Sequence, residues 1–203
     1  MKNVCRCGLV VGIAGVLALG GSSLAQQGTQ SGTSGGNSTM SGSSSAGRKM
    51  DKKLQRRLEE IHADNQAELK LGQLAAQNAE SPDVKQLAAQ MQSDHQKFDT
   101  RLVETAQKAG ATLEGKAYQK AQKGAAKEAN KLQSKTGKDF DKAFISRTVK
   151  DHEKDVKEVK KTAEEAQKAN QPELASLLQR AETAVESHLE HAKQIEQSLQ
   201  KGE

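Results

Sequence analysis

The sequence has almost no aromatic residues, and its two cysteines, Cys5 and Cys7, lie at its start. It contains three Phe, one Tyr and no Trp among 203 residues. Proteins that bind single-stranded nucleic acid stack bases on aromatic side chains, so this composition argues against a nucleic-acid partner. Four of the 31 Lys and Arg residues precede residue 50, which leaves 27 of them beside 26 Asp and Glu. The later part of the chain therefore has no strong positive charge to attract phosphates.

The first 25 residues have the pattern of a secretory signal peptide. A positively charged start is followed by an apolar run over residues 8–19, and Ser23 and Ala25 supply the small residues that signal peptidase recognises. We therefore expect residues 1–25 to be cleaved and the mature protein to be periplasmic or extracellular. An uncleaved membrane anchor is the alternative, although a run of twelve residues is short for a membrane span.

Residues 26–49 consist almost entirely of Gly, Ser, Thr and Gln. Such a segment buries too little apolar surface to offset its ordering entropy, so we expect a disordered linker. The remaining residues, 50–203, suit one domain, and we expect no transmembrane segment in the mature chain. This domain has no cysteine, so disulfides and thiolate ligands are excluded, and an apolar core or a bound ligand must stabilise it.

The domain is predicted to be all-α. It is rich in Ala, Leu, Gln, Glu and Lys, and its apolar residues recur every three or four positions, as on one face of a helix. Long helices are expected over residues 50–78, 82–109, 138–169 and from 172 onward. The connection over 111–137 is expected to contain a shorter helix over 116–135. Four long helices with one long crossover between the second and third describe a ferritin-like four-helix bundle.

Turn residues and apolar spacing refine this prediction. Ser81 is expected to cap the second long helix, with Pro82 at its first position, and Gly110 is expected to follow its end. The buried face of the first helix is predicted from the spacing of its apolar side chains. These are Leu54, Leu58, Ile61, Leu69 and Ala76.

Three helices carry a histidine where the buried face requires an apolar residue. His95 lies four residues after Met91, His152 three after Val149, and His188 three after Val185. Glu68 lies on or beside the buried face of the first helix. All four residues lie at similar distances from the turns that join their helices, so we expect them to meet at mid-bundle.

Three imidazoles and one carboxylate are a ligand set that suits a transition metal such as Zn, Cu or Fe. Asp94 and Asp151 each precede a histidine, but neighbouring positions on a helix point about 100° apart. Each aspartate is therefore expected to orient a histidine on another helix. His191 lies one turn beyond His188, nearer the edge of the face. Met91 suggests copper, although a methionine on an apolar face is more often part of the core.

Two other interpretations use the same residues. The histidines and carboxylates could form a polar layer that fixes helix register without a metal. The bundle could instead bind a protein partner in the bacterial envelope through an outer face. Catalysis has little support, because the mature chain lacks a thiol nucleophile and a serine in a glycine-flanked turn. The two Glu-x-x-His motifs of a di-iron bundle are also missing around the three histidines.

Several short motifs resemble the DUF4142 family. They are residues 68–75 and 91–95, and the pairs Phe140-Asp141, Asp151-His152 and His188-Leu189. The resemblance covers about residues 51–200. It implies a ferritin-like fold and an exported bacterial protein, often labelled an outer-membrane protein. It names no activity and no cofactor.

Overall fold

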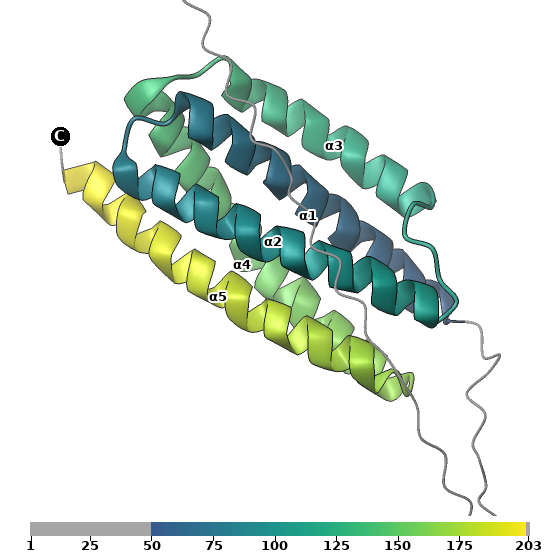
Figure 1. Cartoon of the computed structure of the whole chain (residues 1–203). Coiled ribbons are helices and arrows are strands. Elements are labelled where there is room, and N and C mark those ends of the chain that lie inside the picture. Colours follow the sequence, from purple (N-terminus) through teal and green to yellow (C-terminus); the bar gives the residue numbers. More distant parts are fainter. Residues whose placement is uncertain (1–49, 202–203) are drawn as a thin grey trace, which may run out of the picture. The chain divides into compact units, whose positions relative to one another are not determined.

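The computed structural model describes residues 50–201, and all regular secondary structure in this part of the chain is helical, with no strand (Figure 1). The predicted signal peptide over 1–25 and linker over 26–49 lie outside the described residues. The five helices are α1 (Lys52–Asn78), α2 (Pro82–Lys108), α3 (Lys116–Gln133), α4 (Gly137–Lys168) and α5 (Pro172–Lys201). The all-α prediction is confirmed, and the predicted bounds agree with these within a few residues. Within residues 50–201, no helix has the length and apolar character needed to cross a membrane.

The four longer helices pack around a common core. α1 packs against α2 and α4, and α5 packs against α2 and α4, while α3 lies along α1 with few contacts to α4 (Figure 1). The buried apolar side chains form two separate clusters. One contains Leu58, Leu102 and Val159, and the other contains Leu71, Met91 and Ile145. In α1, α2, α4 and α5, the residues between the two clusters include buried polar side chains, so a polar layer divides the core.

Two helix starts are capped by carboxylates. Asp51 accepts hydrogen bonds from the backbone N–H groups of Lys53 and Leu54 at 2.9 and 3.1 Å. Ser81 occupies the N-cap position of α2 as predicted, but its side chain makes no capping bond. The buried carboxylate of Asp141 accepts from the Ser81 N–H at 2.7 Å instead. The cap is therefore supplied by α4, 60 residues away, where the sequence pattern suggested the local serine.

The buried face of α1 differs from the predicted one. Leu54 and Leu58 are buried as expected, but Ala76 is exposed and Ile61 and Leu69 are only half-buried. The buried positions after Leu58 include His62, Asn65, Glu68, Leu71, Gly72 and Ala75. These positions recur with helical spacing, on a face of α1 that is rotated about the helix axis relative to the predicted apolar face. The rotation follows from the polar side chains, because Asn65 and Glu68 contact histidines of neighbouring helices.

Candidate metal centre

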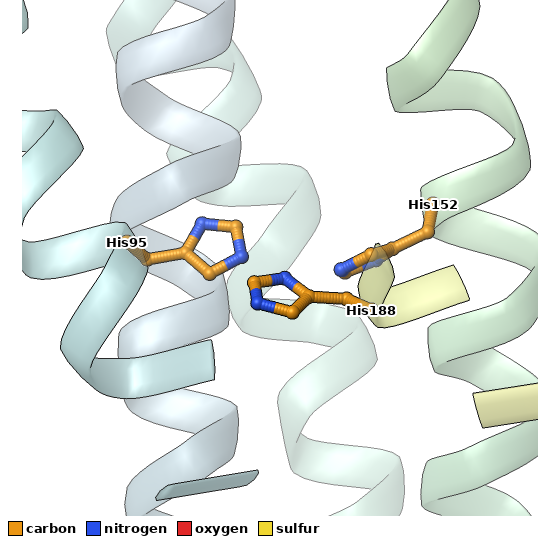
Figure 2. Close-up of side chains that lie close together, drawn as sticks. All are labelled: His95, His152 and His188. Carbon is orange, nitrogen blue, oxygen red and sulfur yellow. The ribbon is translucent and has the colours of Figure 1, made fainter. Parts of the chain in front are cut away.

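Three histidines from three helices meet in the polar layer between the two apolar clusters (Figure 2). His95 comes from α2, His152 from α4 and His188 from α5, and each is at most 9% exposed. The ring centroids are 5.5 to 5.8 Å apart. One nitrogen of each ring lies within 4.8 Å of a nitrogen of each of the other two. The structure thus brings together the three histidines that the spacing placed at mid-bundle, and metal ligation by them stays a prediction.

Glu68 of α1 lies against two of these rings. Its Oε2 atom is 2.8 Å from His95 Nε2, and its Oε1 atom is 3.2 Å from His152 Nδ1. Burial raises the pKa of the Glu68 carboxyl, but the facing His152 and His95 rings outweigh burial and hold that pKa well below its usual value. Burial lowers the pKa of His152, but the Glu68 carboxylate outweighs it and the pKa is raised. Glu68 is therefore an ionised carboxylate at the centre of the layer.

Asn65 fixes the orientation of the His95 ring. The side-chain Nδ2 of Asn65 donates to the His95 backbone carbonyl at 3.0 Å, which directs its Oδ1 toward the ring. His95 Nδ1 lies 2.6 Å from that oxygen and donates to it. A neutral ring with its proton on Nδ1 then presents the Nε2 lone pair to Glu68 Oε2. Two acceptors facing each other require a proton or a metal ion to join them.

Asp94 of α2 orients the His188 ring of α5 through one of its ring nitrogens. His188 Nε2 donates to Asp94 Oδ2 at 3.1 Å, so a neutral ring has an unprotonated Nδ1. Burial lowers the pKa of His188, and the Asp94 carboxylate only partly opposes this effect. Asp94 contacts a histidine on another helix, as the sequence pattern predicted. Such a hydrogen bond on the far nitrogen is how proteins orient histidines that bind metals.

The other residues proposed from the sequence lie outside this arrangement. Asp151 pairs with Arg147 on its own helix, with Nε and Oδ2 2.9 Å apart, so the prediction that it orients a histidine was wrong. Arg147 is one helical turn away, and its guanidinium provides a stronger local partner than a distant imidazole. Met91 is 3% exposed and packs in the apolar core, which favours the core interpretation. His191 lies one turn beyond His188 and is half-buried.

The four central residues contain five buried polar atoms that have no hydrogen-bond partner among the described residues. They are Glu68 Oε2, His95 Nε2, both ring nitrogens of His152, and His188 Nδ1. Three of them, Glu68 Oε2, His95 Nε2 and His152 Nδ1, belong to the ion pairs of Glu68, whereas His152 Nε2 and His188 Nδ1 have no partner of either kind among the described residues. Buried polar atoms are normally paired, because an unpaired one costs about 1–3 kcal/mol. One metal ion could be bound by Glu68, His95, His188 and one nitrogen of His152, so the donor set fits a transition metal.

Sequence reasoning missed two residues of this region. Asn65 lies three residues before Glu68, and Asp155 lies three after His152, so both share a helix face with a predicted ligand. Ligand atoms of Asp155, Glu68 and His152 lie within 4.8 Å of one another. Burial, followed by the nearby carboxylates of Glu68 and Asp64, raises the pKa of Asp155 to about 8. Their spacing of three residues from Glu68 and from His152 was the sequence signal that could have identified them as site residues.

A cavity of about 680 Å³ joins this layer to the surface. Glu68, His95 and His188 line its inner part, and exposed residues such as Lys120 and Lys154 line its outer part. Lining residues come from α1, α2, α3, α4 and α5. More acidic than basic side chains face the cavity, so its field favours entry of cations. His95 and His188 are therefore buried but line a cavity that a small ion can enter.

One comparison with known proteins gives a match. The chain matches the family described as "Domain of unknown function (DUF4142)" over residues 39–195, which confirms the resemblance drawn from the short motifs. No curated protein and no solved structure matches the chain. The evidence for a function therefore comes from the site itself.

Proposed function

The chain belongs to the DUF4142 family, whose description names no activity, and from that premise we propose that it binds a transition-metal ion at mid-bundle. His95, His152 and His188 are the nitrogen ligands, and Glu68 is the carboxylate ligand. The role is one of binding, without catalysis. The proposed fold is a ferritin-like four-helix bundle in which α3 is part of a crossover between α2 and α4.

The observation that carries this proposal is the group of five buried atoms without a hydrogen bond on the four residues, two of which, His152 Nε2 and His188 Nδ1, have no ion-pair partner either. Ligands of one tetrahedral ion with bonds of about 2.0 Å lie roughly 3.3 Å apart. The distances from Glu68 to His95 Nε2 and His152 Nδ1, 2.8 and 3.2 Å, are close to this value. One nitrogen of each of the three histidines already lies within 4.8 Å of a nitrogen of the others, so the rings need to move inward by only a small amount.

The ligand types select the class of ion. Imidazole nitrogens suit Zn, Cu, Fe and Ni, whereas Mg and Ca prefer sites made of oxygen atoms only. Asn65 and Asp94 each occupy one ring nitrogen of a histidine and direct the other inward. This preorganisation supports Zn, Cu or Fe as the bound ion.

The second candidate function is a structural or interaction bundle in which the cluster is a polar packing layer. The pairing of Glu68 with two histidines and of Asp94 with a third favours it, because such contacts fix helix register without a metal. The two candidates differ in one measurable property, the affinity of the folded chain for metal ions.

Calorimetry on the chelator-treated full chain tests the proposal. Titration with Zn²⁺, Cu²⁺ and Fe²⁺ should show tight binding of at least one ion, lost in His95→Ala and in His152→Ala. His191→Ala is the matched control, since it removes a half-buried histidine one turn from the site, and it should bind normally. A folded wild-type chain that binds none of the three ions would refute the metal site and leave the polar layer.

We also propose that the protein is exported and acts outside the cytoplasm, on the basis of the pattern in residues 1–25. N-terminal sequencing of the protein recovered from the periplasm or medium should show that the mature chain begins at Gln26. Full-length chain retained in a membrane fraction would contradict cleavage.

A further inference from the structure

A second group of metal-ligating side chains adjoins the three histidines. It consists of Glu68, His152 and Asp155, whose ligand atoms lie within 4.8 Å of one another. His152 and Asp155 are one turn apart on α4, and Glu68 comes from α1. This group shares His152 with the first cluster but adds two carboxylates. Mixed imidazole and carboxylate sites are typical of divalent transition metals.

The shared residues have enough ligand atoms to serve two ions. His152 is fully buried, and neither of its ring nitrogens has a hydrogen-bond partner among the described residues. A single ion can use only one of these nitrogens. Glu68 likewise directs its two oxygens at different histidines, Oε2 at His95 and Oε1 at His152. One ion at the three histidines would therefore leave a His152 nitrogen and a Glu68 oxygen available.

We propose that a second divalent transition-metal ion binds on Glu68, His152 and Asp155, beside the ion on the three histidines. This inference rests on the proposed function, since it completes the same site. His152 then binds one ion through each ring nitrogen and releases its ring proton to solvent, and Glu68 bridges the two ions through its carboxylate. Asp155 is the ligand that belongs to the second ion alone.

Lys154 occupies the outer side of this second subsite. Its Nζ atom is 3.3 Å from Asp64 Oδ2 and 4.0 Å from Asp155 Oδ1. Its side chain is 65% exposed, so it can move into solvent when a divalent ion takes its place. The ammonium group also repels an incoming ion. Removing this charge should strengthen binding of the second ion, whereas removing Asp155 should abolish it.

The test is the number of Zn²⁺ ions bound per full chain after chelator treatment, measured by equilibrium dialysis with metal analysis. The wild-type chain should bind two ions and Asp155→Asn one. Lys154→Met should bind two, with the second bound roughly tenfold more tightly, as expected for loss of a charge a few Å from a divalent ion. Asp151→Asn is the matched control, because Asp151 lies on the same helix but pairs with Arg147, and it should bind two.

The outcomes separate this inference from the metal site itself. One ion in both the wild-type chain and Asp155→Asn would overturn the second subsite and leave the first. Two ions in folded Asp155→Asn would also overturn it. No ion in the wild-type chain would overturn the proposed function together with this extension. Circular dichroism of each variant establishes that it is folded.

Discussion

Two groups of buried histidines share α1 and α2 but differ in hydrogen bonding. In the first, which we call the His62 cluster, His62 Nδ1 lies 2.7 Å from Asp99 Oδ1, and the other oxygen of Asp99 accepts from Gln66. The Tyr118 ring of α3 stacks on His62, with ring centroids 5.0 Å apart. Among the described residues, the His62 cluster (His62, Gln66, Asp99 and Tyr118) has no buried polar side-chain atom without a partner.

His62 and Asp99 are as buried as the mid-bundle cluster of Glu68, His95, His152 and His188. In the mid-bundle cluster, however, five polar atoms lack a hydrogen bond among the described residues, and two of these also lack an ion-pair partner. Burial and the presence of histidine therefore do not distinguish a structural pair from a ligand site. The distinction lies in whether the buried atoms satisfy one another. The His62 cluster is complete and attaches α3 to α1, whereas the mid-bundle cluster leaves His152 Nε2 and His188 Nδ1 without a partner among the described residues.

The largest expected effect comes from breaking the complete cluster. Asp99→Ala should lower the free energy of unfolding by about 3 kcal/mol, because it leaves the buried His62 ring and the half-buried Gln66 amide without a partner. His188→Leu in metal-free protein should change it by less than about 1 kcal/mol, since it replaces an incompletely bonded group with an apolar one. Urea unfolding at pH 7 measures both values. Asp99→Asn, which keeps one acceptor oxygen, should fall between them, and equal losses at the two sites would contradict the comparison.

Metal should stabilise the protein through the mid-bundle cluster alone. Zn²⁺ at 100 times its dissociation constant should raise the free energy of unfolding by about 2.7 kcal/mol, because it binds only the folded state. Asp99→Asn should keep this gain, and His152→Leu, which removes the histidine shared by both proposed ions, should lose it. Urea midpoints with Zn²⁺ and with chelator give the result. A gain that persists in His152→Leu would place the ion elsewhere.

The metal-free protein should lose stability as the pH rises from 6.5 to 8. The folded pKa of Asp155 is about 8, above its ordinary value of 3.8, and His152 is raised above 6.5. Both groups hold protons in the folded state that the unfolded state has released, so stability falls as the pH rises through their folded pKa values. The pKa of Glu68 is shifted downward from 4.5, and its opposite contribution is complete by pH 6.5. The pKa of His188 is also lowered, so its opposite contribution continues to about one unit above the unfolded value of 6.5 and reduces the fall in the lower part of this range.

One such proton corresponds to a slope of at most about 1.4 kcal/mol per pH unit. Urea midpoints at pH 6.5 and 8 should show the loss in the wild-type chain and a smaller loss in Asp155→Asn. The variant keeps the shape of the side chain but not its titration, and the His152 contribution remains. Equal losses in the two proteins would show that Asp155 does not titrate in this range.

The smallest effects concern α3, which carries Tyr118 to the His62 cluster. A Cβ atom added at Gly115 would clash with the Glu59 carboxylate. The buried Glu59 carboxylate accepts from the Ala117 N–H at 3.1 Å at the start of α3. Gly115→Ala should therefore cost about 1 kcal/mol through loss of this cap. Gly124→Ala, in open space within the same helix, should stabilise by about 0.8 kcal/mol. Thermal unfolding compares the two, and a stabilised Gly115→Ala would refute the role of Glu59.

Much of this protein's structure could be predicted from its sequence, because it depends on interactions between residues that are close together in the chain. Helical periodicity depends on hydrogen bonds between residues four apart, so the faces that carry His95, His152 and His188 could be identified without knowing their neighbours. The helix ends could be predicted from the sequence for the same reason. Gly110, with φ of 75°, follows α2, and Asn170, with φ of 57°, separates α4 from α5. These positions require a left-handed backbone that glycine and asparagine adopt at low cost.

Only the tertiary structure decided which polar groups meet. Asp141 caps a helix 60 residues away, and Asn65 selects the inward nitrogen of His95 from a neighbouring helix. The rotation of α1 that buries Ala75 and exposes Ala76 follows from such contacts. A sequence pattern fixes spacing along one helix, but the axial rotation of that helix depends on packing against others. The pairing of His62 with Asp99, and the incomplete bonding of the mid-bundle cluster, both follow from that packing.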